Sequence, residues 1–377
     1  MALKLLVLPD KFKGTLTAPQ AADAITRGWR RARPDDRIEP LPMSDGGDGF
    51  GDVMRHLLHA RPRKLRTRDA AHRPCQTEWH WNGQNRTAII ESARIIGLSM
   101  LPPGKYHPFD LDTFGLGAAI TAAIQAGAQR CLIGIGGSAT NDAGFGMARA
   151  LGWKFLDADD RLIERWTELE RLQRLVPPES GRPPGRMRVQ VAVDVRNPLL
   201  GPNGCSRVYG PQKGLRPDDF PRAEAALSRL AAVVKRELKQ DHARRPGAGA
   251  AGGLGFGLMT FLNAEPIPGF ALFARHANLE QKLRKAGLVI TGEGAIDRSS
   301  VMGKGVGEIA RLCKKHGVHC IALGGMIDDP RVTRRHFAAL HGLTDLTSSK
   351  NARRRPEYWL ERLAWTTARQ WSETNPA

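Results

Sequence analysis

The two ends of the chain share one order of elements, and this order limits the possible folds more than any other feature. Short apolar runs predict strands at residues 3–8, 37–43, 288–291 and 320–323. Amphipathic patterns predict helices at residues 17–29, 50–59, 306–316 and 356–371. Because strands that alternate with helices form parallel sheets, the two ends predict one parallel sheet with its loops at the carboxyl ends of the strands.

The middle of the chain has a different pattern, which predicts a second domain. Residues 63–95 alternate with a period of two, as antiparallel strands do. Further strands are expected at 131–135 and 189–193, and helices at 115–126, 224–238 and 254–262. We predict a two-domain α/β protein, with a discontinuous parallel-sheet domain at residues 1–65 plus 281–377 and an inserted mixed α/β domain at residues 66–280.

The charge and the cysteines exclude several classes of protein. The net charge of +19 is typical of nucleic-acid binding. However, the basic residues are scattered over polar faces and do not alternate with aromatic ones, so we expect a solvated surface that can attract an anionic ligand, and no nucleic-acid partner. The 5 cysteines show no CxxC spacing, which argues against a disulfide scaffold or a zinc site.

The apolar runs also bear on location. None approaches the roughly 20 residues that a membrane span needs. The first run is too short for a signal peptide. We expect a cytoplasmic protein with no membrane partner.

Four loops after predicted strands combine glycine with acidic, amide or lysine side chains. They lie at residues 10–15, 45–49, 134–142 and 291–305. Glycine lets backbone N–H groups approach a phosphate, carboxylates hold Mg²⁺ or accept a proton, and lysine neutralises phosphoryl oxygens. The loops therefore predict phosphate chemistry, with capped structural turns as the alternative.

The first two loops offer a cation and a pair of acids. Lys13, beside Gly14, can reach an anion, or it can lie in a solvated surface loop. Asp45 and Asp48 suit a metal or a substrate hydroxyl, or one of them caps a tight turn.

The third loop has three interpretations. A phosphate or a sugar can contact Gly136, Gly137, Ser138 and Thr140. Asn141 and Asp142 would then be polar ligands. Residues 134–139 also fit the loose dinucleotide fingerprint, although Asn141 and Asp142 are foreign to such a loop. A purely structural glycine turn is the third interpretation.

The fourth loop and two further segments complete the set. Glu293 and Asp297 share one loop, and Lys304 is flanked by glycines ahead of a helix, although no Walker A motif is present. Asp194 closes a strand, and Lys213 lies between loop-forming residues. A compact ammonium beside glycine suits a crowded phosphate site better than a guanidinium does.

In chain order these loops resemble those of the glycerate kinase family, type 1. The similar segments are PDKFKGTLTA (9–18), SDGGDG (44–49), GIGGSATNDAG (134–144), DVRNPLLG (194–201), YGPQKG (209–214), GAGAAGGLG (247–255) and TGEGAID…GKG (291–305). The resemblance implies transfer of phosphate from ATP to D-glycerate, usually giving 2-phosphoglycerate, with Mg²⁺. It also implies a two-domain α/β fold whose active site lies in the cleft between the domains.

The kinase hypothesis gives each candidate a role. Asp45 or Asp194 accepts the proton of the substrate hydroxyl, and Glu293 and Asp297 organise Mg²⁺. The transferring phosphoryl group is stabilised by Lys13, Lys213 and Lys304. The nucleotide is contacted by Gly136, Gly137, Ser138, Thr140 and Asn141. The alternatives are a kinase of a related hydroxy acid, an NAD-binding oxidoreductase and a basic nucleic-acid-binding protein; the oligomeric state and the choice between 2- and 3-phosphoglycerate stay open.

The chain departs from the family pattern at several positions. Lys11 stands where the family commonly has Ser, Ala143 where it commonly has Gly, and Ala295 where it commonly has Arg. If that Arg binds the substrate carboxylate in relatives, either Arg196 or Lys11 does so here, or the acceptor differs.

Overall fold

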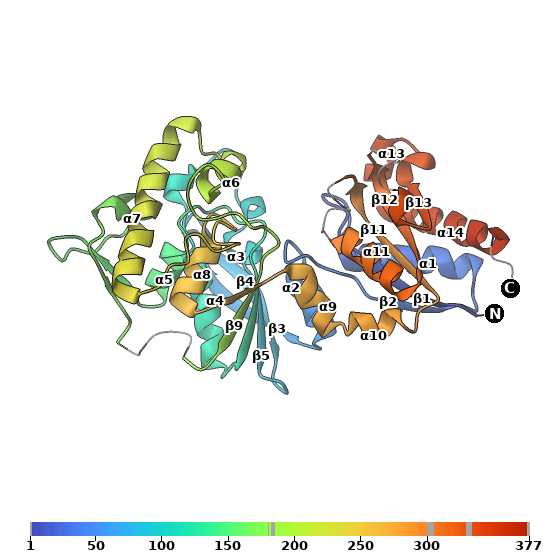
Figure 1. Cartoon of the computed structure of the whole chain (residues 1–377), viewed down its shortest axis with the longest axis horizontal. Coiled ribbons are helices and arrows are strands. Elements are labelled where there is room, and N and C mark those ends of the chain that lie inside the picture. The colour runs from blue at the N-terminus through green and yellow to red at the C-terminus, as the bar shows by residue number, and fades with distance from the viewer. Residues whose placement is uncertain are drawn as a thin grey trace. The chain divides into compact units, whose positions relative to one another are not determined.

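The computed structural model describes residues 2–179, 181, 185–298, 300, 305–328 and 334–374. The chain folds as two units: Met1–Asp45 with Phe270–Ala377, here called the terminal unit, and Gly46–Gly269, the inserted unit (Figure 1). Each unit contains a sheet with helices packed on it, so the predicted α/β class with a parallel-sheet part and a mixed part is confirmed. No helix in the described ranges is long and apolar enough to cross a membrane.

The terminal unit contains a five-stranded sheet in the order β13-β12-β11-β1-β2, and all its pairs are parallel. The strands are β1 (Lys4–Pro9), β2 (Arg37–Pro40), β11 (Leu288–Ile296), β12 (His319–Ile327) and β13 (Ala339–Gly342). Two strands that lie far apart in the sequence, β1 and β11, are neighbours in the sheet. The two ends of the chain therefore build one sheet, as the sequence predicted.

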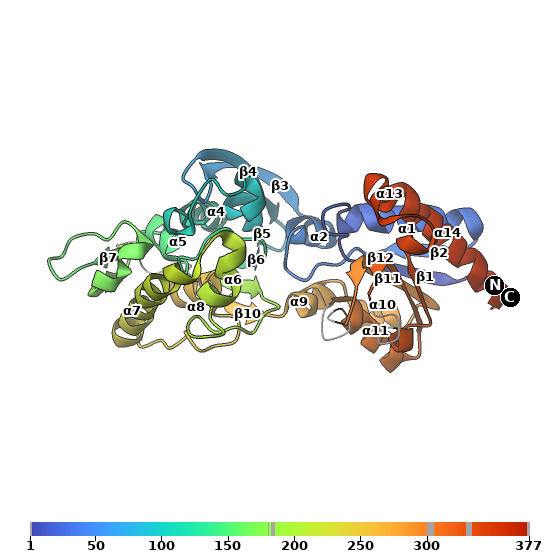
Figure 2. The ribbon, with the colours of Figure 1, turned by 90° about the horizontal axis from the view of Figure 1, so that it is seen from above.

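The order of the strands reverses between β1 and β11. From β1 the chain passes through α1 (Ala18–Ala32) to β2 on one side, whereas from β11 it passes through α11 (Gly305–His316) to β12 on the other. Figure 2 shows α1 and α14 (Pro356–Thr374) on one side of this sheet and α10 (Leu279–Leu283) and α11 on the other. Right-handed crossovers that run in opposite directions produce this arrangement. Such a reversal leaves a crevice at the carboxyl ends of the two central strands.

The apolar pattern of the strands accounts for the core of the terminal unit. Leu5 and Val7 of β1 and Ile290 of β11 form one buried cluster with Trp29 of α1 and Leu360 of α14. Helix α1 starts as predicted, with a capping box between Thr17 and Gln20. Helix α13 (Ser349–Arg354) precedes α14.

The inserted unit contains a six-stranded mixed sheet in the order β10-β9-β6-β5-β4-β3. Parallel pairs join β5 (Thr87–Glu91), β6 (Arg130–Gly134), β9 (Arg188–Ala192) and β10 (Glu265–Ile267). Antiparallel pairs join β5 to β4 (Pro74–Asn82) and β4 to β3 (Arg61–Arg68). The antiparallel hairpin followed by parallel strands matches the predicted change of pattern.

The helices of the inserted unit cover this sheet, and most of them contribute to one large core. They are α2 (Phe50–Leu57), α3 (Ala93–Ile96), α4 (Phe114–Gln125), α5 (Phe145–Ala150), α6 (Cys205–Lys213), α7 (Phe220–Leu238) and α8 (Leu254–Leu262). A small hairpin, β7 (Lys154–Leu156) with β8 (Arg174–Val176), lies beside them. The helices predicted at 115–126, 224–238 and 254–262 correspond to α4, α7 and α8.

Strand β3 forms one edge of the mixed sheet. Its sequence is RPRKLRTR, and all five of its basic side chains are exposed. A charged edge with a proline is a common way for a sheet to avoid pairing with another strand.

The boundaries between the units lie after Asp45 and Gly269, rather than after residues 65 and 280. Helix α2 packs on the inserted unit, because the ring of Phe50 fills the space beside Gly134, where a Cβ atom would lie 2.6 Å from it. Helix α10, which follows α9 (Gly269–His276), packs on the terminal unit, where Glu280 accepts a bond of 3.0 Å from Lys315.

The prediction that a loop begins at residue 291 is wrong, because β11 continues to Ile296. Its neighbour β12 likewise continues to Ile327. Glycines allow this close pairing. A Cβ atom on Gly292 would lie 2.1 Å from the carbonyl oxygen of Leu323, and one on Gly325 would lie 2.4 Å from that of Gly294. The glycines that suggested a loop are needed for two strands to approach closely.

Candidate active site

Acidic side chains gather where β1 ends beside Gly292 and Glu293 of β11, at the reversal in the terminal sheet. Asp10 directly follows β1, and its backbone N–H donates to the carbonyl oxygen of Gly292 at 2.8 Å. Burial raises the pKa of Asp10 to about 7, and the charge of Asp45 and, less strongly, that of Glu293 add to this rise. Three carboxyl groups from distant parts of the chain therefore share one electrostatic environment.

Asp45 reaches this place because the chain continues alongside β1 after β2. The backbone N–H of Leu41 donates to Val7, and that of Met43 donates to Pro9. The Nζ atom of Lys11 lies 4.0 Å from Oδ1 of Asp45. The predicted site residues Asp45 and Glu293 are thus brought together, and Asp10 and Lys11 join them.

The other predicted residues of the terminal unit have different surroundings. Lys13 is exposed, and its backbone nitrogen would lie 3.0 Å from a Cβ atom on Gly294, so the 10–15 loop runs against β11. Asp297 forms a local turn with Ser300, whose N–H donates to Oδ1 at 3.0 Å. Lys304 lies outside the described residues.

In the inserted unit, Lys213 is not in a loop, as the sequence suggested, but is the last residue of α6 and is 6% exposed. Its Nζ atom donates to the carbonyl oxygen of Thr140 at 2.6 Å and to Oγ of Ser138 at 3.0 Å. Burial lowers the pKa of Lys213 to about 8, although the nearby thiol of Cys205 and the charge of Asp142 oppose this. An ammonium carries three N–H groups, so one more can bind a ligand.

Two buried oxygen atoms lie in the same loop as these contacts. Oγ1 of Thr140 and Oδ1 of Asn141 have no hydrogen-bond partner among the described residues, and both side chains are 0% exposed. Nδ2 of Asn141 donates to Oγ of Ser206 at 3.0 Å, which fixes the amide. Because buried polar atoms are almost always satisfied, these two mark a place for water or for a polar ligand.

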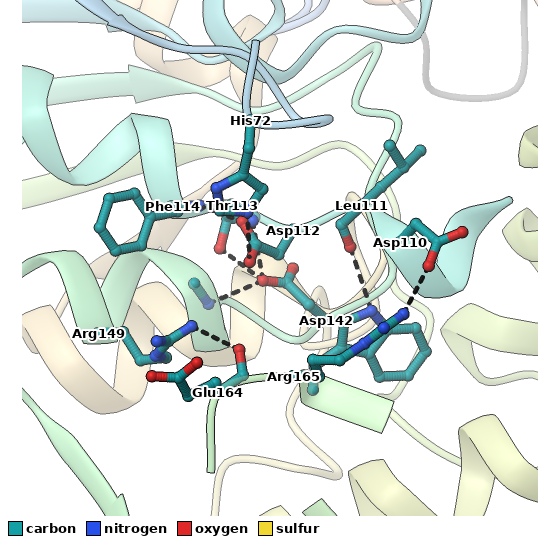
Figure 3. A network of polar contacts seen from close by, with 12 residues as sticks. His72, Asp110, Leu111, Asp112, Thr113, Phe114, Asp142, Arg149, Glu164 and Arg165 are labelled. Carbon is teal, nitrogen blue, oxygen red and sulfur yellow. Dashed lines mark hydrogen bonds and ion pairs between the residues drawn. The ribbon is translucent and has the colours of Figure 1, made fainter. Parts of the chain in front are cut away.

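Asp142 does not serve as an open ligand, contrary to the expectation from its place in the loop. Its Oδ2 atom accepts bonds from the backbone N–H of Thr113 at 2.9 Å, the hydroxyl of Thr113 at 2.7 Å and the N–H of Gly146 at 2.9 Å (Figure 3). The carboxylate therefore anchors the loop to α4 and α5.

The glycines of the loop have a packing role. A Cβ atom on Gly136 would lie 2.6 Å from Cα of Gly47, and one on Gly137 would lie 2.3 Å from Oδ1 of Asp48. The N–H of Gly136 donates to the carbonyl oxygen of Gly46 at 3.3 Å. The 46–48 loop thus fills the space that we expected a phosphate to use.

Asp194, just after β9, is exposed, and its Oδ1 atom accepts a bond of 2.9 Å from the N–H of Gly269. Gly46 packs on Ala192 at the same strand end, where a Cβ atom would lie 2.6 Å away. Both points where the chain passes between the units therefore adjoin the end of β9. The predicted residues form two groups, one in each unit.

A third group of potential metal ligands lies elsewhere in the inserted unit. Ligand atoms of Asp52, Glu78 and His80 all lie within 4.8 Å of one another. However, Arg94 donates to Asp52 at 2.6 Å and to Glu78 at 2.7 Å. The guanidinium already neutralises these acids, so we interpret the group as a structural ion-pair network.

Sequence reasoning missed Asp10 and the anchoring role of Asp142. Asp10 directly follows a predicted parallel strand, and that position was a usable signal. Thr113, which donates two of the bonds to Asp142, lies 29 residues earlier in the chain, and no pattern in the sequence connects the two.

Comparisons with known proteins bear on the whole chain. The model of the glycerate kinase family matches residues 5–372. A protein of Escherichia coli strain K12 named glycerate 2-kinase is 38% identical over 339 residues, which cover 89% of this chain and 88% of that protein. A glycerate kinase of Halalkalibacterium halodurans is 37% identical over 324 residues, 86% of this chain and 85% of that one.

A solved structure is similar over almost the full length. It is a crystal structure of a protein from Salmonella typhimurium LT2, provisionally named glycerate kinase 2, with a TM-score of 0.86 and 32% identity, covering 99% of both chains. The sequence segments, the fold and these relatives agree, and the chain belongs to the glycerate kinase family of phosphotransferases.

Proposed function

We propose that this enzyme transfers the terminal phosphate of ATP to the 2-hydroxyl of D-glycerate. Family membership supports the reaction, and the name of the Escherichia coli relative supports the 2-position. The structural observation that carries the proposal is the buried ammonium of Lys213, held by Ser138 and Thr140 beside two unpartnered oxygens. We further propose a cytoplasmic location, with no nucleic-acid or membrane partner.

The group around Lys213 suits the phosphates of a nucleotide. A buried lysine is costly unless an anion or several acceptors compensate it, and burial lowers its pKa to about 8. A bound phosphate would raise that pKa and use the third N–H. We therefore assign nucleotide binding to Lys213, Ser138, Thr140 and Asn141, with Gly136 and Gly137 shaping the loop.

The acidic group of the terminal unit fits Mg²⁺. Carboxylate oxygens are the ligands this ion prefers. Burial is the main cause of the raised pKa of Asp10, and the charges of Asp45 and Glu293, which add to it, would be balanced by a cation. Glu293 and Asp45 would share in holding the ion, as would Asp297. When bound, Mg²⁺ neutralises the phosphate oxygens during transfer. Lys13 and Lys304 are proposed to stabilise the transferring phosphoryl group.

The base that accepts the hydroxyl proton comes from the same acids. When no cation is bound, burial raises the pKa of Asp10 to about 7, so its carboxylate accepts a proton more readily than an ordinary one. We add Asp10 to the earlier candidates Asp45 and Asp194, and we favour Asp10 with its neighbour Asp45.

The substrate carboxylate needs a cation, and the family's usual Arg is replaced by Ala295. Lys11 is the favoured replacement because its ammonium lies 4.0 Å from Asp45, among the proposed catalytic acids. Arg196 is exposed near Asp194 and is the second candidate. A related hydroxy acid as acceptor is the alternative. A Lys11→Met variant should raise the KM for D-glycerate with little change in the KM for ATP.

The dinucleotide alternative has no structural support. In a dinucleotide-binding unit the helix begins at the glycine loop, directly after the strand. Here residues 135–144 separate β6 from α5, and Asp142 anchors that stretch. The loop therefore lacks the open helix terminus that a pyrophosphate would need.

A coupled assay of ADP release tests the proposal. We expect release that depends on both D-glycerate and Mg²⁺, and NMR of the product should show 2-phosphoglycerate. Release with another hydroxy acid, but not with D-glycerate, would show that the acceptor is wrong. NADH binding without ADP release would reject the kinase.

A further inference from the structure

A chain of polar contacts connects a partly exposed histidine to the loop that contacts Lys213. Oδ2 of Asp112 lies 3.0 Å from Nε2 of His72. Asp112 precedes Thr113, whose backbone and side chain both donate to Asp142. Figure 3 shows His72 directed toward Asp112, with Asp142 beyond Thr113.

Asp142 is completely buried and joins the first turns of two helices. Thr113 precedes α4, and Gly146 lies in the first turn of α5. The hydroxyl of Thr113 also accepts a bond of 2.9 Å from the N–H of Met147, which closes the network. A carboxylate is favourable at the start of a helix, so this position holds Asp142 firmly.

The other side of the loop is held by α6. Thr140 accepts the bond from Lys213, and Asn141 donates to Ser206. Residues 138–142 are therefore fixed between α6 on one side and α4 with α5 on the other. A change in how Asp142 is held must alter the loop that contacts Lys213.

The charges of Asp112 and Asp142 repel each other, so a nearby cation is needed to keep both carboxyl groups ionised. Burial and the charge of Asp112 raise the pKa of Asp142 to about 6. The hydrogen bond with Asp112 raises the pKa of His72, although burial and the charges of Arg68 and Arg149 oppose this rise. Of the other charged groups that face Asp142, Lys213 is the cation across the loop. A protonated His72 balances Asp112 and so favours an ionised Asp142.

The position of His72 is itself fixed. It lies in a turn with φ of 58°, a left-handed conformation that is uncommon for residues other than glycine. Asp69 holds this turn by accepting bonds from the N–H groups of Ala71 at 2.9 Å and Arg73 at 3.0 Å. The ring of Phe114 lies 5.7 Å from that of His72. The turn keeps the imidazole in place against Asp112.

We propose that His72 and Asp112 are positioning residues that act through Asp142 to hold residues 138–141 in the geometry that binds ATP. The proposal rests on the proposed function, because it assigns ATP to the Lys213 group. Neither residue touches the substrate in this scheme. Loss of the positive charge on His72 should weaken ATP binding and leave glycerate binding unchanged.

The variant His72→Gln tests this directly, and His107→Gln is a matched control. His107 also forms a partly exposed ion pair, with Asp219 at 3.2 Å, but it does not belong to the group that holds Asp142. For His72→Gln we expect the KM for ATP at pH 6.5 to rise about threefold to tenfold, with kcat and the KM for D-glycerate nearly unchanged. The ratio of the variant's KM to that of the wild type should fall toward one as the pH rises through the raised pKa of His72, because the wild-type imidazole then loses its proton as well.

Hydrogen exchange separates this inference from the function itself. Amides in residues 135–147 should exchange faster in His72→Gln than in the wild type, whether or not the enzyme phosphorylates glycerate. A variant with a KM ratio that is the same at all pH values, or with exchange no faster than in His107→Gln, would overturn the inference. Wild-type protein that releases no ADP, but shows the predicted change in exchange, would instead reject the proposed function.

Discussion

The Nζ atom of Lys213 lies 2.6 Å from the carbonyl oxygen of Thr140 and is almost completely buried. A charge in this position is costly for folding and finds its compensation in acceptors of the 138–140 loop. Functional sites often retain such costly groups because the chemistry needs them.

Replacing Lys213 with Met should separate activity from stability. We expect kcat/KM to fall by at least about 100-fold, because the cation proposed to bind the phosphates is lost. The free energy of unfolding should change by no more than about 1–2 kcal/mol, since a buried charge and its hydrogen bonds disappear together. Steady-state kinetics and urea denaturation measure the two effects. Lys235→Met, at an exposed ion pair with Asp241, is the control and should keep full activity.

The lowered pKa of Lys213 predicts a limit to ATP binding at alkaline pH. Its pKa is about 8, so the ammonium is lost as the pH rises through that value in the free enzyme. The KM for ATP should therefore increase above pH 8. A Lys213→Arg variant that retains measurable activity should lack this increase, because a guanidinium stays charged. An identical rise in both proteins would mean that another group titrates.

The raised pKa of Asp10 predicts a change of stability with pH. The folded protein binds the proton up to about pH 7, whereas the ordinary carboxyl releases it near 3.8. The contribution of Asp10 to the free energy of unfolding is thus fully present below pH 3.8 and is lost as the pH rises through about 7. Between pH 5 and pH 8 the wild type should lose more stability than Asp10→Asn, as urea denaturation can measure. Asp159→Asn, at an exposed ion pair, should behave like the wild type.

The acidic group beside the end of β1 predicts a dependence on magnesium. In Glu293→Gln the Mg²⁺ concentration for half-maximal activity should rise roughly tenfold, because one carboxylate of the proposed site is lost. Titration of activity with Mg²⁺ at saturating ATP gives this value. Glu280→Gln, on α10, removes an equivalent charge elsewhere and should leave the value unchanged. Equal shifts in both variants would point to a general effect of charge.

The packing of the 46–48 loop on Gly136 predicts a cost for any side chain there. A Cβ atom would lie 2.6 Å from Cα of Gly47, and backbone cannot move aside as a flexible side chain can. We expect Gly136→Ala to lower the free energy of unfolding by about 1–3 kcal/mol. Gly83→Ala is the comparison, since its nearest neighbour is a side-chain atom of Trp81 at 3.3 Å. Thermal denaturation of the two variants measures this difference in stability.

Much of the fold was readable from the sequence because the decisive patterns are local. The apolar run at residues 3–8 and the capping box at Thr17 lie within single elements, and both are present. The extension of β11 to Ile296 was not readable, since glycine between charged residues is typical of loops. Only its partner β12, with glycines at 324 and 325, makes that stretch a strand.

The site was predictable to a smaller degree. Glycine, lysine and acid in one loop indicated phosphate chemistry, and Ser138, Thr140 and Lys213 do come together. The sequence could not show that Lys213 ends a helix or that Asp142 faces inward. Those facts depend on contacts with Thr113 and Ser206 from other parts of the chain. Local composition identifies the type of loop, whereas long-range packing decides which of its atoms are accessible.

The basic edge strand β3 has a consequence for the protein at high concentration. Strand β3 carries five exposed positive side chains, and it is the edge strand at one end of the mixed sheet. Two copies that met edge to edge would place like charges opposite each other along eight residues, and repulsion would oppose their union. This edge should therefore resist the growth of intermolecular sheets, and neutralising it should make the protein more prone to aggregate.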